Sequence, residues 1–147
     1  MKQSTPLLLL AIAIAVFSVS CNKKSTKSAD EKNITSGSWK IQSVTANGAD
    51  VSGFVPACVL DNDFTFQSGG VGMLKENANV CSPSNEGNFL WGFNNSRTQL
   101  TMTTDLIPGG TSDFTIITLS ATTFVLSQES SLVPSPDPVT VTVTLVH

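Results

Sequence analysis

Few side chains in this sequence have the chemistry of a catalytic or metal-binding site. The only histidine, His147, ends the chain, so we expect a solvated terminus and not a general base oriented by a third group. Asp61 and Asp63 could form paired carboxylates or calcium ligands, but their loop lacks the glycine and distal glutamate of an EF-hand. Hydrogen bonds in a turn before a strand suit them better. Arg97 could pair with these carboxylates, lie against an indole ring, or be solvated. We therefore expect no enzyme, no metal site and no cofactor.

Cys21 has the surroundings of a cysteine that is acylated after secretion. A basic start is followed by eleven apolar residues, 7–17. These would span about 16 Å as a helix, which is too short for a bilayer core of about 30 Å, so we interpret residues 1–20 as a signal peptide. The run Ser18-Val19-Ser20-Cys21 resembles the lipobox of bacterial lipoproteins, in the relaxed form of the Bacteroidota, because Ser18 stands where leucine is usual. A buried N-terminal helix and ordinary signal cleavage are the alternatives.

Residues 21–36 are polar, charged and poor in apolar side chains, so they are predicted to form a flexible tether. Two acyl chains on Cys21 would anchor the chain stably to a membrane. In similar lipoproteins an acidic run directly after the cysteine directs export to the surface, but Lys23 and Lys24 occupy that place here. We therefore expect attachment to the outer membrane, with the periplasmic side favoured over the cell surface.

The remaining residues, 37–147, are enough for one domain. The sequence has eight Lys and Arg residues against eleven Asp and Glu residues, a net charge of −3, and Arg97 is its only arginine. This charge balance provides no basic patch for a nucleic acid. Threonine, serine, valine and asparagine are common, which is typical of a β-rich domain.

Cys58 and Cys81 remain as a pair once Cys21 carries a lipid. An envelope protein meets oxidising conditions, so we predict a disulfide between them, which the chain-entropy estimate values at roughly 3.5 kcal/mol. Two buried free thiols are the alternative. A metal site has less support because the sequence offers no further cysteine and no interior histidine.

Alternating apolar and polar residues predict about eight short strands separated by turn residues, and no convincing helix. One sheet cannot cover its own apolar face, so it must close on itself or pack on a second sheet. Sequential hairpins favour an all-β fold, an antiparallel eight-stranded up-and-down β-barrel, and a β-sandwich is the alternative. The proline-rich stretch 132–138 cannot be a central strand. The predicted strands are 37–44, 63–67, 71–76, 88–93, 98–103, 113–120, 123–128 and 139–146.

An ordered set of motifs runs from Ser36 to Ser127. The motifs are Gly37-Ser38-Trp39, Asn47-Gly48, Pro56-Ala57-Cys58, Asp61-Asn62-Asp63, Phe64-Thr65-Phe66, a glycine turn, Cys81 and Gly87 to Trp91. This set resembles the lipocalin-like domain of Bacteroidota lipoproteins. It differs from the usual pattern in the spacing between Gly87 and Trp91, and the stretch near Pro136 does not align. The resemblance implies an antiparallel β-barrel, a disulfide position typical of the family and a small apolar ligand, and it implies no established activity.

Six aromatic side chains are predicted to point into the barrel, where they either line a ligand cavity or fill the core. A barrel of eight strands can do either. With a cavity, we expect the domain to bind a small hydrophobic ligand. With a filled core, we expect a structural or protein-interaction accessory of the envelope, with its partner unknown and an outer apolar patch near Val51–Val55 or Ile107. The six residues are Trp39, Phe64, Phe66, Phe89, Trp91 and Phe93.

Overall fold

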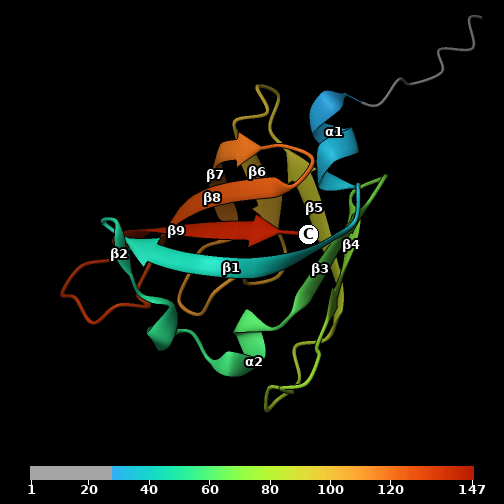
Figure 1. The fold of residues 1–147 in the computed structure, drawn as a ribbon. Helices are drawn as coiled ribbons and strands as arrows, with labels where there is room; N and C mark the ends of the chain where they lie inside the picture. The colour runs from blue at the N-terminus through green and yellow to red at the C-terminus, as the bar shows by residue number, and fades with distance from the viewer. Residues whose placement is uncertain (1–27) are drawn as a thin grey trace, which may run out of the picture.

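The structure, a computed structural model, describes residues 28–147 and contains one antiparallel sheet closed into a barrel (Figure 1). Eight strands follow one another around the barrel, and the two-residue β2 is an addition at the edge of β1. The predicted up-and-down barrel is therefore confirmed over the sandwich. The strands are β1 (Ser38–Ala46), β2 (Ala49–Asp50), β3 (Asp63–Gln67), β4 (Val71–Lys75), β5 (Gly87–Phe93), β6 (Gln99–Met102), β7 (Asp113–Leu119), β8 (Thr123–Ser130) and β9 (Val139–Val146).

Closure of the barrel depends on the pairing of the first long strand with the last. β1 pairs with β9 from Lys40↔Val146 to Ala46↔Val141, and only its first three residues pair with β3. A register shift between Ile41 and Ser43 bends β1 as it passes from one neighbour to the other. The alternation of valine and threonine in β9 matches this position, because Val141, Val143 and Leu145 are buried.

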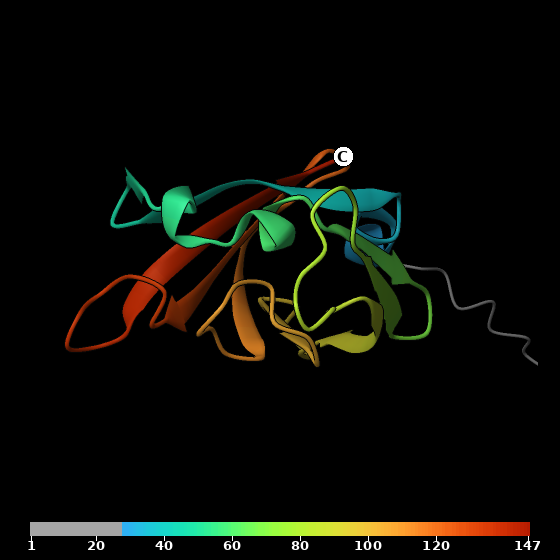
Figure 2. The same ribbon diagram turned by 90° about the horizontal axis from the view of Figure 1, so that it is seen from below.

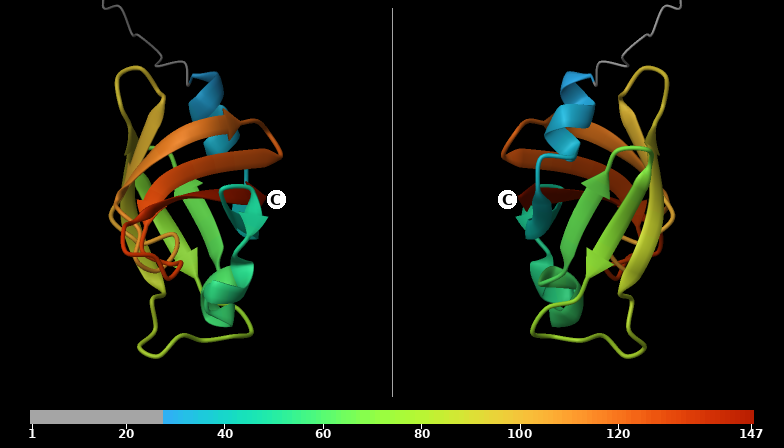
Figure 3. Two further views of the ribbon diagram at one scale, coloured as in Figure 1. Left: turned by 90° about the vertical axis from the view of Figure 1, so that its left-hand side faces the viewer. Right: turned by 90° about the vertical axis from the view of Figure 1, so that its right-hand side faces the viewer.

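The short and the long connections between strands lie at opposite ends of the barrel. Three tight turns, 68–70, 94–98 and 120–122, lie at one end with the helix α1 (Ala29–Ile34) and the C-terminus, and we call this the turn end. Four longer connections, 47–62, 76–86, 103–112 and 131–138, lie at the other end, which we call the loop end (Figure 3). The connection 47–62 contains β2, the 3-10 helix η1 (Ser52–Phe54) and the helix α2 (Ala57–Leu60). Figure 2, viewed from below, faces the loop end.

The helix α1 corrects the predicted tether and the prediction that the domain has no helix. Ser28 caps this helix by accepting a hydrogen bond from the Glu31 N–H (3.2 Å), and Ile34 is fully buried. The Trp39 indole N–H donates to the Ile34 carbonyl (2.8 Å). The helix was missed because six residues with a single buried apolar side chain give no helical period. The folded domain thus begins near Ser28, and the rest of the predicted tether, 21–27, lies outside the described residues, as do the predicted signal peptide 1–20 and Cys21.

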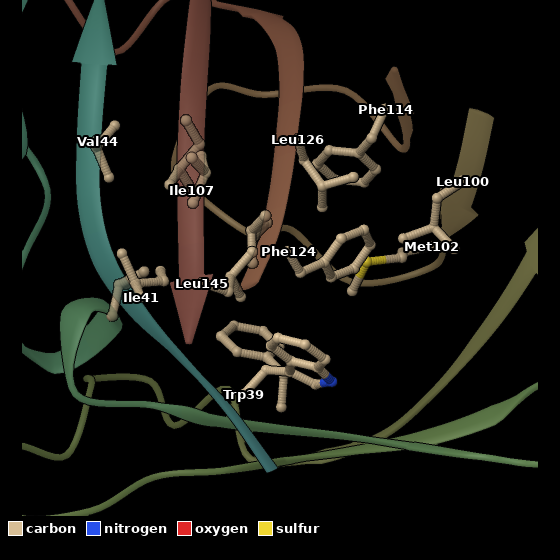
Figure 4. Close-up of a cluster of buried hydrophobic side chains, with 14 of the residues drawn as sticks. Trp39, Ile41, Val44, Leu100, Met102, Ile107, Phe114, Phe124, Leu126 and Leu145 are labelled. Atoms are coloured by element: carbon tan, nitrogen blue, oxygen red, sulfur yellow. The ribbon is translucent and has the colours of Figure 1, made fainter. Parts of the chain in front are cut away.

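A continuous apolar core fills the barrel (Figure 4). The largest side chains that are almost completely buried are Trp39, Phe64, Phe114 and Phe124. The Trp39 ring meets the Phe124 ring edge to face at 5.6 Å between centroids, an arrangement that aromatic pairs prefer. Within residues 28–147, no helix is long and apolar enough to cross a membrane.

Removing the buried side chain of α1 tests whether this helix belongs to the folded domain. Ile34→Ala is expected to lower the free energy of unfolding by about 2–4 kcal/mol, because it leaves a cavity under the barrel. The matched control is Ile117→Ala on the outer face of β7, where Ile117 is 56% exposed, and its effect should stay within about 0.5 kcal/mol. Guanidinium chloride unfolding followed by tryptophan fluorescence measures both changes. Equal effects of the two substitutions would show that α1 is not part of the folded domain.

Candidate functional site

A disulfide fastens two of the connections at the loop end to each other. Cys58 on α2 is bonded to Cys81 in the connection 76–86, with 5.2 Å between their Cα atoms. This pairing confirms the predicted disulfide. The two cysteines are 23 positions apart, so the bond limits the movement of both connections at one side of the barrel opening.

The Glu76 carboxylate holds the connection 76–86 together through hydrogen bonds. It accepts hydrogen bonds from the Cys81 N–H (3.0 Å), the Asn85 N–H (3.2 Å) and the Ser84 hydroxyl (2.6 Å). The hydrogen bond from Ser84 lowers the pKa of Glu76 below its ordinary value, and those from Cys81 and Asn85 add to this against the opposing effect of burial. Glu76 therefore acts as a structural centre of the loop.

Asp61 and Asp63, which the sequence suggested as paired carboxylates, make separate contacts. Asp61 accepts hydrogen bonds from the backbone and side-chain N–H groups of Asn79, both at 2.9 Å, and thereby joins α2 to the connection 76–86. Asp63 pairs instead with Lys40 on β1 at 3.2 Å. Among residues 28–147 no group of three or more His, Cys, Asp and Glu side chains gathers as a metal site would require. The structure thus agrees with the role in turns for Asp61.

Arg97 and His147 lie at the turn end, far from Asp61. The Arg97 guanidinium lies over the Phe93 ring at 5.8 Å and approaches Asp30 of α1 at 4.0 Å, so its aromatic contact is a phenyl ring and not an indole. His147 is exposed to solvent, as expected of the terminus. Its ring also lies against the Trp39 ring, with 3.9 Å between their centroids, and is hydrogen-bonded to the Ser38 carbonyl (2.9 Å). Arg97, in the turn 94–98, and Asp61, in the connection 47–62, therefore lie at opposite ends of the barrel.

The predicted aromatic set points inward, but it fills the barrel. Trp39, Phe64, Phe66, Phe89 and Trp91 are buried, and Phe93 is half-buried near the turn end. Phe66 packs edge to face against Phe89 (5.4 Å) and Trp91 (5.5 Å). Side chains with almost no exposed surface leave no space beside them that water could enter. The structure therefore favours the filled core over a cavity lined by these rings.

Two connections at the loop end insert apolar side chains into the barrel opening. Leu106 and Ile107 in the connection 103–112 are completely buried, and Val55 and Val59 enter from the connection 47–62. Figure 4 shows Ile107 among the core side chains that also include Leu126 and Leu145. We call Leu106 and Ile107 the plug. The plug occupies the place through which a ligand would enter the interior of an open barrel.

Hydrogen bonds from β8 and from Ser131, the residue after it, hold the segment that follows the plug. The Ser130 hydroxyl donates to the Pro108 carbonyl at 3.2 Å. The Gln128 side-chain carbonyl accepts from the Thr111 N–H at 3.1 Å. The Ser131 N–H donates to the Gly109 carbonyl at 3.0 Å, and Gly109 has a positive φ of 69° that favours glycine.

A pocket of about 250 Å³ opens beside the plug, between α2 and the connections 76–86 and 103–112. Its apolar surface is provided by Pro108 and the edge of Val59, and the completely buried Ile107 lies behind them. Asn85, Thr104 and Asp105 supply polar groups. An apolar wall with a few polar groups is the usual composition of a site for a small molecule. We call this the loop-end pocket.

A family model for a lipocalin-like domain matches residues 35–126, from just before β1 into β8. The chain belongs to the lipocalin-like domain family. No curated protein matches the chain. The family match confirms the resemblance at the level of the domain, and lipocalin-like domains are in general binding proteins without catalytic activity.

The plug is the part of the candidate site that the sequence did not predict. An outer apolar patch was predicted near Val51–Val55 or Ile107. Ile107, Val51 and Val55 are buried, whereas Phe54 in the first of these segments is 54% exposed. The available signal was the apolar pair Leu106-Ile107 within an otherwise polar connection, directly before Pro108. Such a pair in a loop either forms an exposed patch or turns into the core, and only the three-dimensional structure distinguishes the two.

Removing the disulfide is expected to loosen the loop end. Replacing both Cys58 and Cys81 with alanine should lower the free energy of unfolding by about 2–4 kcal/mol, because the unfolded chain is no longer cross-linked. Amide exchange should accelerate in the connections 47–62 and 76–86 and stay unchanged in α1. Reduction of the wild-type protein is the matched control and should shift the urea midpoint similarly. An unchanged midpoint after reduction would contradict a role of the disulfide in stability.

Proposed function

We propose that this lipocalin-like domain binds a small apolar molecule at the loop-end pocket and performs no catalysis. The observation that supports this function best is the pocket itself, which has apolar walls, borders the plug and is framed by connections that the disulfide and Glu76 hold in place. A preformed frame lowers the cost of ordering loops on binding.

The size and lining of the pocket define the ligand class. A volume of about 250 Å³ corresponds to a short acyl chain or one or two rings, because one water molecule takes about 30 Å³ in the liquid. The apolar part would lie on Val59 and Pro108, and a neutral polar group would face Asn85 and Thr104. The Asp105 carboxylate disfavours a ligand with an anionic head group. Displacement of the plug would extend the site into the barrel.

We place this binding domain at the outer membrane, attached through lipids on Cys21 and facing the periplasm. The signal-peptide pattern, the small residues before Cys21 and the lysines after it support this location. The folded domain begins near Ser28 at the turn end. A segment of seven residues reaches at most about 25 Å, so the anchor would hold the turn end near the membrane and leave the loop-end pocket on the far side.

A second candidate function, a protein-interaction accessory of the envelope, is supported by an outer apolar patch. Val71, Met73 and Leu90 are exposed on neighbouring strands, and Val71 pairs directly with Leu90 in the sheet. The filled core also fits this function. Wild-type protein that takes up no apolar probe, together with crosslinking to a protein through β4 and β5 in membranes, would favour it.

Filling the loop-end pocket should weaken ligand binding. The neutral two-ring probe 6-propionyl-2-(dimethylamino)naphthalene is expected to bind the wild-type protein saturably with a rise in fluorescence, and Thr104→Trp should weaken binding at least about tenfold by occupying the space, a loss of about 1.4 kcal/mol. The matched control is Thr118→Trp on the exposed outer face of β7, which should bind as the wild type does. Absence of saturable binding to the wild type, or equal binding by both variants, would overturn this assignment.

Lipid attachment is tested separately from ligand binding. Cys21→Ser should release the protein from the membrane fraction and prevent labelling by radioactive palmitate during growth, because serine offers no thiol for acylation. The control is Cys58→Ser together with Cys81→Ser, which should remain labelled and in the membrane fraction. Retention of the label by Cys21→Ser would exclude this residue as the anchor.

A further inference from the structure

The disulfide is connected to two residues that line the loop-end pocket from different connections. Cys58 directly precedes Val59 in α2, and Val59 forms one edge of the pocket. Cys81 reaches the pocket through a carboxylate. The Glu76 Oε1 atom accepts hydrogen bonds from the Cys81 N–H (3.0 Å) and from the Asn85 N–H (3.2 Å), and Asn85 lines the pocket. One covalent bond therefore holds two parts of the pocket wall at a fixed separation.

These two parts of the wall have little structure of their own. The helix α2 has four residues, and its N-cap Pro56 makes no side-chain hydrogen bond to it. A helix of this length is not stable alone. The connection 76–86 is without a helix or strand, and Val80 beside Cys81 is 67% exposed. Both segments therefore depend on other parts of the molecule for their position.

The barrel, in contrast, does not depend on the disulfide for its closure. Both cysteines lie outside the strands, and β1 pairs with β9 without them. Hydrogen bonds from Asn79 to Asp61 (2.9 Å) also join the two segments, but they lie at the exposed surface, where water competes for the same groups. Breaking the covalent bond is therefore expected to loosen the pocket wall and to leave the strands in place.

The disulfide is open to exchange with a small dithiol, because both cysteines are partly exposed to solvent. A thiolate of the dithiol attacks one sulfur atom, forms a mixed disulfide and releases the other cysteine as a thiolate. The second thiol of the dithiol then displaces the remaining cysteine. The dithiol is oxidised to a disulfide, and the protein gains two electrons and, once both thiolates are protonated, two protons.

We propose that the Cys58–Cys81 bond is a redox switch for the loop-end pocket. The pocket binds its apolar ligand in the disulfide form and loses affinity when a dithiol reduces the bond, because Val59 and Asn85 are then no longer held together. This inference rests on the function proposed above. Coupling between the bond and the ligand is reciprocal, so a bound ligand makes the disulfide harder to reduce by the same factor.

Binding of 6-propionyl-2-(dimethylamino)naphthalene to the purified protein tests the switch. Fluorescence titration is expected to give an affinity about five- to tenfold lower in dithiothreitol than without it, while circular dichroism shows that the strands are retained. In a dithiothreitol redox buffer, a saturating amount of the probe should raise the ratio of disulfide to dithiol protein by the same factor. Equal affinity of the two forms, or loss of the strand signal together with binding, would overturn the switch. Absence of binding to the oxidised protein would overturn the proposed function as well.

Variants separate the effect of the bond from the effect of the reductant. Replacing both Cys58 and Cys81 with serine should give the low affinity of the reduced protein, with no further response to dithiothreitol. Glu76→Ala keeps the disulfide but removes the acceptor between Cys81 and Asn85, so the oxidised variant should bind more weakly and respond less to reduction. The matched control is Glu129→Ala on the exposed surface of β8, which should respond as the wild type does. A full response of Glu76→Ala would contradict the link through this carboxylate.

Discussion

The pairing of β1 with β9 is the interaction on which the rest of this structure depends. It turns a row of hairpins into a closed barrel, so that every long strand has two hydrogen-bonded neighbours. Closure also fixes which side chains face inward, because side chains alternate along each strand. The register Val44↔Val143 and Ile41↔Leu145 places apolar residues of both strands on the same inner face. A shift of one residue would expose them, so the apolar pattern and the closure support each other.

The filled interior determines where this lipocalin-like domain can bind other molecules. Large rings such as Trp39, Phe66 and Phe124 occupy the volume that a ligand would need. At the turn end, short turns, α1 and the stacked His147 close the barrel. Only the loop end has connections long enough to form walls of a site, and the loop-end pocket is found among them. The topology thus concentrates the candidate site at one end.

The sequence predicted the barrel well because its strands bury one face and expose the other. The alternating valine and threonine residues of β9 show this period without ambiguity, and the structure confirms the predicted strands with small differences at their ends. The paired cysteines could likewise be predicted, since only one pairing was available after Cys21. The Ser28 cap of α1 is a local signal, because Ser28 and Glu31 are three residues apart. The helix was nevertheless missed because the burial of Ile34 and the hydrogen bond from Trp39 to its carbonyl are tertiary features. The plug was missed for the same reason, because two apolar residues in a loop have no period.

The two sides of the barrel opening are held by different kinds of interaction, which indicates how the interior could become accessible. On one side, the disulfide and the hydrogen bonds to Glu76 join α2 to the connection 76–86, and the covalent bond alone contributes about 2–4 kcal/mol. On the other side, the connection 103–112 is held by a few hydrogen bonds from β8, each worth about 0.5–1.5 kcal/mol net, and by burial of Leu106 and Ile107, worth about 1.5–3 kcal/mol each. An apolar ligand that takes the place of the plug replaces this burial with its own. The connection 103–112 contains no cysteine, so an apolar ligand could displace the plug without breaking a covalent bond, and the loop-end pocket borders this connection.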